Sequence, residues 1–198
     1  MRSSEVARGP ESVFHITTYK CGSQWVRDIL ASPEVISASG LTHTSRAPYL
    51  HQGFIPEKEK GNLYSPVYDL NALEWRGIGK GFSKGIVVLR DPRDIVVSLL
   101  YSHLYSHASG PRVDYSRRRL FDLPNMEARL SHLFGHNSTN MRFLLSWSDY
   151  TENDVYIVRY EDLIQQQQEI FSKIFDWLGW KLSEEMVSAI IDRHSFKR

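Results

Sequence analysis

The stretch from Val13 to Leu30 constrains the fold of this chain more than any other. Its first half is rich in β-branched residues and alternates apolar with polar positions, which is typical of a strand. Its second half places Trp25, Val26 and Ile29 at helical spacing, and the join between the halves, Tyr19 to Gln24, contains a lysine and a glycine. Free backbone N–H groups and the positive end of a helix dipole favour an anion at such a join. The stretch therefore predicts a strand, an anion-binding loop and a helix.

The loop needs support from a second motif. Ser23 is predicted to cap the helix, because its hydroxyl can accept a hydrogen bond from the first turn. The G-x-x-x-x-G-K-[ST] pattern of NTP hydrolases is absent, since here the lysine precedes the glycine. Taken alone, a loop of this kind is more often an ordinary surface turn.

The second motif begins with the unbroken aliphatic run Ile86 to Leu89, which is typical of a parallel strand covered on both faces. Asp91 then suits the N-cap of a helix and Pro92 its first position. Arg90 thus stands at the carboxyl end of a central strand, where open α/β sheets bind their ligands. We expect Arg90 and Lys20 to face one crevice, although a salt bridge from Arg90 to a nearby aspartate is the alternative.

The rest of the chain is predicted to complete one α/β domain. Ser32-Pro33 should end the first helix, and Pro33 to Lys60 and His107 to Pro124 lack a sustained period, so both are expected to be loops. The other predicted elements are a strand at Leu63 to Leu70 bent by Pro66, two helices between Met126 and Trp147, a strand at Val155 to Arg159, an amphipathic helix from Leu163 to Leu178 ended by Gly179, and a helix from Glu184 to Arg193 that begins after Ser183.

The composition fits a single domain. At 198 residues and 41% hydrophobic, the chain can bury one core, so one domain over residues 1–198 is expected, with a central, mostly parallel sheet flanked by helices. Lys and Arg number 24 and Asp and Glu 23, and this near balance disfavours nucleic acid and anionic membranes as partners. No apolar run approaches the roughly 20 residues of a membrane span. The single cysteine, Cys21, excludes an intrachain disulfide and suits a cytoplasmic location. The composition predicts no oligomeric state.

Both motifs resemble those of the sulfotransferases that use 3'-phosphoadenosine-5'-phosphosulfate (PAPS). T-T-Y-K-C-G-S-Q-W is similar to their 5'-phosphosulfate loop T-Y-P-K-S-G-T-T-W, with Lys20, Gly22 and Trp25 retained. I-V-V-L-R-D-P-R-D-I-V-V-S resembles their 3'-phosphate motif R-[ND]-P-[RK]-D-x-x-x-S. R-Y-E-D-L and the final H-S-F resemble the family's Y-E-D-L and its T-S-F adenine contact. The order of the two phosphate motifs also matches, which makes the resemblance specific.

The resemblance implies a P-loop-like nucleotide site that binds PAPS and its product adenosine 3',5'-bisphosphate (PAP). It places the 5'-phosphate on the loop, the 3'-phosphate on Arg90 and Ser98, and adenine beside Trp25, Tyr160 and the final H-S-F. The cofactor-binding residues that it implies are Lys20, Cys21, Gly22, Ser23, Gln24, Trp25, Arg90, Ser98, Tyr160, Ser195 and Phe196.

The same resemblance implies sulfuryl transfer by in-line displacement, without a metal. Such a reaction depends on positioning and charge stabilisation, so Lys20 is expected to neutralise charge on the leaving phosphate. The family's equivalent of Ser98 also restrains this lysine until the acceptor arrives. The family's base is often a histidine in a T-H pair on the preceding strand, and L-Y-S-P-V-Y-D-L has none. We hypothesise that Asp69 is the base, with His51 in reserve.

The acceptor is expected to be a hydroxyl or an amine, on a small molecule or a carbohydrate. The family continues into an R-K-G-x-x-G-D-W segment over the 3'-phosphate, whereas this sequence ends at Arg198, so either the chain is a truncated version or its lid is open. A catalytically impaired protein of the same fold, which binds PAP or a protein partner without turnover, is therefore the alternative. A P-loop-like phosphotransferase is disfavoured by the missing Gly-Lys-Ser/Thr.

Overall fold

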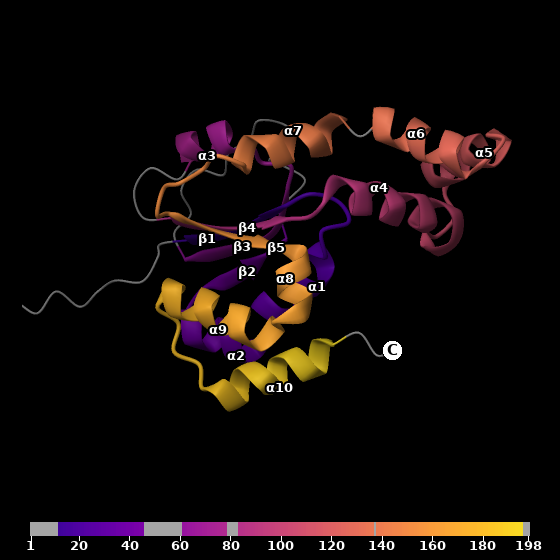
Figure 1. Cartoon of the computed structure of the whole chain (residues 1–198). Helices are drawn as coiled ribbons and strands as arrows, with labels where there is room; N and C mark the ends of the chain where they lie inside the picture. The colour runs from indigo at the N-terminus through magenta and orange to yellow at the C-terminus, as the bar shows by residue number, and fades with distance from the viewer. Residues whose placement is uncertain (1–11, 46–60, 79–82, 137, 196–198) are drawn as a thin grey trace, which may run out of the picture.

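The centre of the computed structural model, which describes residues 12–45, 61–78, 83–136 and 138–195, is a five-stranded sheet (Figure 1). The strand order is β2-β3-β1-β4-β5, and all neighbouring pairs are parallel. The strands are β1 (Ser12–Thr17), β2 (Thr42–Thr44), β3 (Asn62–Tyr68), β4 (Ser83–Leu89) and β5 (Val155–Arg159). Helices cover both faces, as parallel sheets require. The predicted single α/β domain with a parallel sheet is confirmed.

Strand β1 lies in the middle of the sheet, between β3 and β4, and is buried at every position. Val13 lies opposite Leu63 on one side and opposite Lys84 on the other. Because all three strands run the same way, the loops that follow them emerge at one edge of the sheet. This edge therefore receives the loops that follow β1 and β4.

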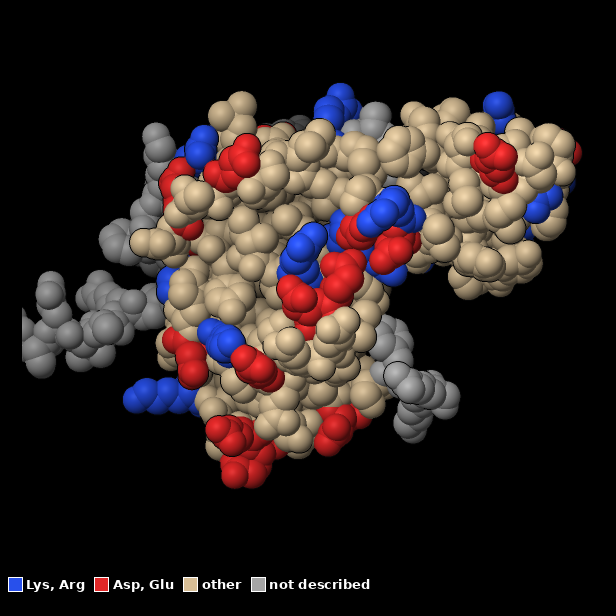
Figure 2. Space-filling model, viewed as in Figure 1, with Lys and Arg blue, Asp and Glu red and all other residues tan. Residues whose placement is uncertain are grey.

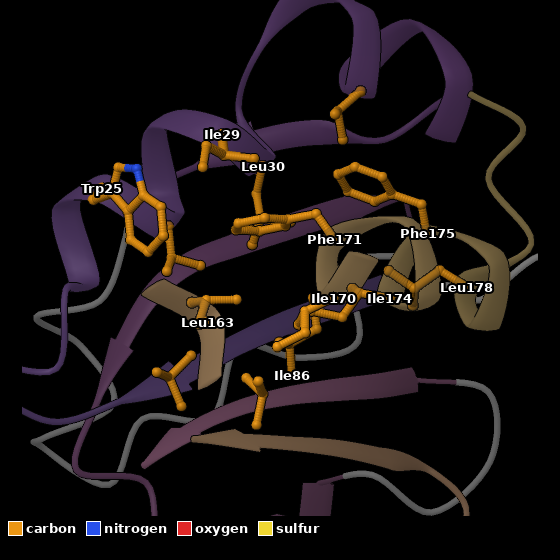
Figure 3. Packing of buried hydrophobic residues seen from close by; sticks show 14 of the residues in the cluster. Trp25, Ile29, Leu30, Ile86, Leu163, Ile170, Phe171, Ile174, Phe175 and Leu178 are labelled. Atoms are coloured by element: carbon orange, nitrogen blue, oxygen red, sulfur yellow. The ribbon is translucent and has the colours of Figure 1, made fainter. Parts of the chain in front are cut away.

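Two helical layers enclose the sheet (Figure 1). One face carries α1 (Ser23–Leu30), α2 (Pro33–Ser39), α8 (Tyr160–Gln165), α9 (Gln167–Leu178) and α10 (Glu184–His194), and the other carries α3 (Ala72–Ile78) and α7 (Ser138–Trp147). Trp25 and Leu30 of α1 pack with Phe171 of α9 and Leu163 of α8 in the larger of the hydrophobic clusters (Figure 3). Such burial supplies most of the stabilisation of a domain of this size.

A helical arm stands to one side of the sheet (Figure 1). Helix α4 (Pro92–Tyr101) continues into a π-helical turn, η2 (Ser102–Ser106), and α5 (Pro111–Asp122) and α6 (Met126–His136) follow. A separate small cluster of buried leucines, Leu100, Leu104 and Leu120, holds the arm together. We call α4, η2, α5 and α6 the arm.

Several predicted helix ends are confirmed. The Asp91 side chain accepts from the backbone N–H of Arg93 at 2.8 Å, and Pro92 stands in the first turn of α4. Ser183 caps α10 in the same way, at 3.3 Å from the backbone nitrogen of Met186. Gly179 ends α9 in the left-handed conformation that favours glycine (φ 77°).

Three predictions about the elements are wrong. Pro33 starts helix α2 rather than a loop, because proline is well suited to a first helical turn. Most of the predicted loop from His107 to Pro124 is helix α5, whose only buried side chain is Leu120 among those described, so it shows little apolar period. The amphipathic helix expected up to Leu178 is divided into α8 and α9 at Gln166, whose backbone is not helical (φ −130°, ψ 45°).

The surface mixes charges of both signs. Figure 2 shows basic and acidic side chains next to one another near the middle of the face in view, in keeping with the net charge of +1. Among the described helices, none has the length and the apolar character that crossing a bilayer requires.

Candidate functional site

A cleft of about 570 Å³ opens where the chain leaves β1, β3 and β4. Its walls come from the loop after β1, the first turn of α1, helix α4 with the turn beyond it, and the ends of α8 and α10. Clefts of this size at the carboxyl edge of a parallel sheet commonly hold ligands. The predicted residues that line the cleft are Lys20, Gly22, Ser23, Gln24, Trp25, Arg90, Ser98 and Tyr160.

The loop after β1 has an unusual backbone. Lys20 (φ 68°) and Gly22 (φ 72°) are both left-handed, and non-glycine residues in this conformation concentrate at functional sites. No described side chain caps the first turn of α1, whose N-cap is Gly22, so the prediction that Ser23 caps the helix is wrong. The Ser23 hydroxyl instead shares a hydrogen bond of 2.8 Å with the Tyr68 hydroxyl. The first-turn N–H groups of α1 are thus left available for an anion.

Gly22 also gives Tyr160 room to approach the loop. A Cβ atom at Gly22 would lie only 2.6 Å from Cε2 of Tyr160, which is far inside van der Waals contact. Any side chain at this position would therefore displace the Tyr160 ring, in addition to straining the backbone.

Arg90 is held at the back of the cleft with unused donor capacity. One of its terminal nitrogens donates to the carbonyl oxygen of Lys20 at 2.6 Å, and its guanidinium lies 4.4 Å from the centroid of the Tyr160 ring. Its Nε is buried and has no hydrogen-bond acceptor among the described residues. The alternative of a salt bridge to an adjacent aspartate is not seen, because Asp91 pairs with Arg93. A guanidinium placed in this way fits a phosphate, since it offers several N–H groups in one plane.

Lys20 reaches across the cleft to the arm. Its ammonium donates to Oγ of Ser102 at 3.0 Å, rather than to Ser98 as the resemblance implied. Ser98 and Ser102 are four residues apart, so they lie one turn apart on the same side of the helix. Burial, followed by the charge of Arg90, lowers the pKa of Lys20. An anion bound between Lys20 and Arg90 would offset both the burial of the Lys20 ammonium and its repulsion by Arg90.

Two of the predicted loop residues face the protein interior. The Cys21 side chain is fully buried in the larger cluster, and burial raises the pKa of its thiol to about 12, so it is not a reactive thiolate at neutral pH. Trp25 is 6% exposed and packs edge-on against Phe171, with ring centroids 5.9 Å apart, although it still borders the cleft. Only backbone groups of Cys21 could thus meet a ligand.

Two of the remaining predicted residues, Asp69 and Ser195, do not line the cleft. Asp69 directly follows β3 with a left-handed backbone (φ 58°) and accepts from the Thr18 hydroxyl at 2.6 Å, but it does not line the cleft. Ser195 is exposed, and its hydroxyl donates to the carbonyl oxygen of Asp192. The neighbouring His194 borders the cleft, whereas Ser195 does not. Phe196 and His51 lie outside the described residues. The described chain has no group of three or more His, Cys, Asp or Glu placed to hold a metal ion.

Sequence reasoning missed two residues beside Lys20. Ser102 accepts from Lys20, and Nδ1 of His107 lies 2.8 Å from the same hydroxyl oxygen. The spacing of Ser102 from Ser98 is the signal that could have found it. His107 could not have been found in this way, because it follows a π-helical turn in a segment that was predicted to be a loop.

Comparison with solved structures shows a shared fold. Mouse sulfotransferase SULT7A1 complexed with PAP is 19% identical, with a TM-score of 0.66, over 93% of this chain and 64% of that one. Retinol dehydratase in complex with androsterone and the inactive cofactor PAP is 15% identical, with a TM-score of 0.57, over 95% of this chain and 65% of that one. The same enzyme with retinol and PAP gives a TM-score of 0.58 at 15% identity, over 94% and 65% of the two chains. The chain thus spans about two thirds of the length of these proteins, or slightly less.

Comparison by sequence identifies the family. No curated protein matches this chain. The family model described as the sulfotransferase domain matches residues 10–198, which is nearly the whole chain and includes both phosphate motifs. The chain therefore belongs to the sulfotransferase domain family.

Proposed function

We propose that this protein transfers the sulfuryl group of PAPS to a hydroxyl or amine acceptor, by in-line displacement. The observation that carries the proposal is the position of Arg90, which is half-buried beside Lys20 and Tyr160 and has a buried Nε with no acceptor among the described residues. Two cations and the uncapped first turn of α1 border one cleft, and this arrangement suits a nucleotide with phosphates at two positions. The solved relatives that hold PAP support the same donor.

Most residues of the cleft have a proposed task. Arg90 and Ser98 bind the 3'-phosphate, and the N–H groups of Gly22, Ser23 and Gln24 hold the 5'-phosphate. PAPS, when bound, supplies the activated sulfuryl group. Lys20 neutralises the charge that grows on the leaving phosphate oxygen, a form of stabilisation that is large in a site sheltered from water. Tyr160 and Trp25 would flank the adenine, and His194 is added to this group because it borders the cleft.

The acceptor class is proposed from the ligands of the solved relatives alone. Retinol dehydratase is described with retinol and with androsterone, which are both apolar alcohols. A small apolar alcohol or a phenol is therefore the first class to try, and a carbohydrate the second. Asp69 as the base stays a prediction; wild-type turnover in both Asp69→Asn and Asp69→Ala would contradict it.

Calorimetric binding of PAP to the whole chain tests the donor site. We expect binding by the wild type and a loss of about 10- to 100-fold or more in Arg90→Ala and Lys20→Ala, since hydrogen bonds to charged groups contribute roughly 1.5–3 kcal/mol each. Arg76→Ala is the matched control, because Arg76 does not line the cleft and its described contacts are an exposed ion pair with Glu152 and the ring of Tyr150. If all four proteins bind PAP equally, or if none does, the proposal is wrong. Binding without sulfuryl transfer to any alcohol, phenol or amine would instead support the impaired binding protein.

A further inference from the structure

A short chain of polar side chains leads from Lys20 into the arm. The Lys20 ammonium donates to Oγ of Ser102 at 3.0 Å, and the same oxygen lies 2.8 Å from Nδ1 of His107. Ser102 is buried, whereas His107 is exposed and borders the cleft. An imidazole is therefore connected, through one hydroxyl, to the cation that faces the leaving group.

His107 is fixed at this place by three further contacts. Its backbone N–H donates to the carbonyl oxygen of Ser102 at 2.9 Å, within the π-helical turn. Its own carbonyl oxygen accepts from Arg117 of α5, also at 2.9 Å. Its ring lies beside that of His103, with centroids 5.5 Å apart. These contacts position an imidazole that would otherwise be mobile, as a group that takes part in chemistry must be.

The hydrogen bond to Ser102 is compatible with two tautomers of His107, because the hydroxyl can accept from Nδ1–H or donate to Nδ1. A hydroxyl oxygen has two lone pairs, and Lys20 uses one of them. The other lone pair can accept a hydrogen carried by Nδ1, and in this tautomer Nε2 keeps its own lone pair. The oriented nitrogen then resembles that of other catalytic histidines, in which a partner on one ring nitrogen leaves the second nitrogen to act.

We propose that His107 is a general base of this cleft, with Nδ1 bonded to Ser102 and Nε2 accepting the proton of a hydroxyl acceptor. The inference rests on the proposed sulfuryl transfer. The acceptor oxygen bonds to sulfur and gives its proton to Nε2, while the bond from sulfur to the phosphate oxygen breaks and that oxygen keeps the electron pair beside Lys20. No other reactant is needed.

Neighbouring groups favour His107 over the other residues that could take this role. Lys20 is linked to the His107 ring through Ser102, Arg117 donates to the His107 carbonyl oxygen, and the His103 ring lies beside that of His107. Burial, followed by the charges of His107, Lys20 and Arg117, lowers the pKa of His103, and His103 does not border the cleft. Asp69 does not border it either, and its carboxylate already accepts from Thr18.

Two phenols of different acidity test the proposal in turnover with PAPS. At mildly alkaline pH, 4-nitrophenol is largely ionised and needs no base, whereas 4-methylphenol must lose a proton in the reaction. We expect His107→Asn to lower kcat/KM for 4-methylphenol by about 100-fold or more, and for 4-nitrophenol far less. His103→Asn, from the same turn, and Asp69→Asn are the comparison variants. An equal loss for both phenols in His107→Asn, or a larger selective loss in Asp69→Asn, would overturn the proposal.

Hydrolysis of PAPS covers the case in which neither phenol is sulfated, because water is then the acceptor. His107→Asn must slow this hydrolysis, and an unchanged rate would count against the base. A wild-type chain that binds no PAP contradicts the proposed function instead.

The ring nitrogens of His107 provide a readout that needs no ligand. In the neutral imidazole, ¹⁵N NMR should find the hydrogen on Nδ1, and Ser102→Ala should move it toward Nε2. A hydrogen already on Nε2 in the wild type would overturn the inference.

Discussion

At the scale of single residues, two separate features of the structure favour glycine at position 22. Its backbone is left-handed, and a Cβ atom would meet the Tyr160 ring at 2.6 Å. We expect Gly22→Ala to lose roughly 1–2 kcal/mol of stability from the backbone alone. It should also weaken PAP binding, because Tyr160 must move away from the guanidinium of Arg90 that it contacts.

Gly40 supplies a matched control for this prediction. Its backbone is equally left-handed (φ 67°), but nothing lies within 4 Å of a Cβ atom built on it. Gly40→Ala should therefore lower stability by a similar amount and leave PAP affinity unchanged. Denaturant unfolding and calorimetry measure the two effects. Unchanged PAP affinity in Gly22→Ala would show that the close approach of Tyr160 does not matter.

His15 makes the stability of the fold depend on pH. It is fully buried in β1, its Nδ1 lies 2.8 Å from Oγ of Ser65, and burial lowers its pKa from 6.5 to about 3. Below pH 6.5 the unfolded chain binds a proton at this residue that the folded chain does not bind. Stability should therefore fall as the pH drops from 6.5 toward 3, with a slope that approaches about 1.4 kcal/mol per pH unit from this group.

His15→Asn removes this titration and leaves a polar group near Ser65. The variant should be less dependent on pH between 6.5 and 4, as measured by denaturant unfolding at a series of pH values. Titration of the carboxylates contributes equally to the pH dependence of both proteins, because both have the same carboxylates. The difference between the two slopes therefore reports on His15. Parallel curves for the wild type and the variant would contradict the prediction.

Residues that a motif fixes by spacing could be predicted, and residues brought in by the fold could not. Lys20 and Arg90 each follow a strand that the sequence pattern predicts, so their meeting at one edge follows from parallel pairing. Ser102 lies 82 positions from Lys20, and only the packing of the arm brings the two together. The lysine partner was accordingly placed one helical turn too early, at Ser98.

At the scale of elements, predictions succeeded where the chain carries its own start and stop signals. Helices α4 and α10 begin after Asp91 and Ser183, whose side chains accept from the first turn, and α9 ends at Gly179. Helix α5 begins with Pro111 and has Asp114 in its first turn, but Gly110 before it offers no side-chain cap. Its three consecutive arginines also made a helix hard to predict, because a run of charges is typical of an exposed loop. In the structure, Arg117 donates to the carbonyl oxygens of His103 and His107. Its helicity depends on contacts that a sequence pattern does not show.

At the scale of the whole molecule, the cleft joins two parts of unequal packing. One part is the sheet with its covering helices, whose large cluster fills the space between β4 and α9 (Figure 3). The other is the arm, which carries Ser102 and stands to the side of the sheet (Figure 1). Elements with few buried apolar side chains open more readily than a domain core. The wall of the cleft that the arm provides should therefore open before the wall that carries Arg90.

Substitution of two leucines, one in each part, tests by hydrogen exchange whether the two parts open separately. Leu120 is 1% exposed within the small cluster of the arm, and Leu163 is fully buried within the large cluster. Leu163→Ala should lower the free energy of global unfolding by about 2–5 kcal/mol and speed the exchange of the most protected amides in β1 and β4. Leu120→Ala should instead speed exchange in α5 and α6 while the amides of β1 and β4 keep their protection.

The consequence for function follows from the position of Ser102 at the base of the arm. Loosening the arm by Leu120→Ala should weaken the contact of Ser102 with Lys20, so sulfuryl transfer should fall. PAP should still bind with nearly wild-type affinity, because Arg90 and the loop after β1 lie outside the arm and Ser98 lies in α4, whose Ile95 packs in the large cluster. Turnover with PAPS and PAP calorimetry on the same variant measure these two effects, and hydrogen exchange shows whether the arm has loosened. If Leu120→Ala speeds exchange equally in the arm and in the sheet, the two parts unfold as one unit and the division of the cleft into a firm and a compliant wall is wrong.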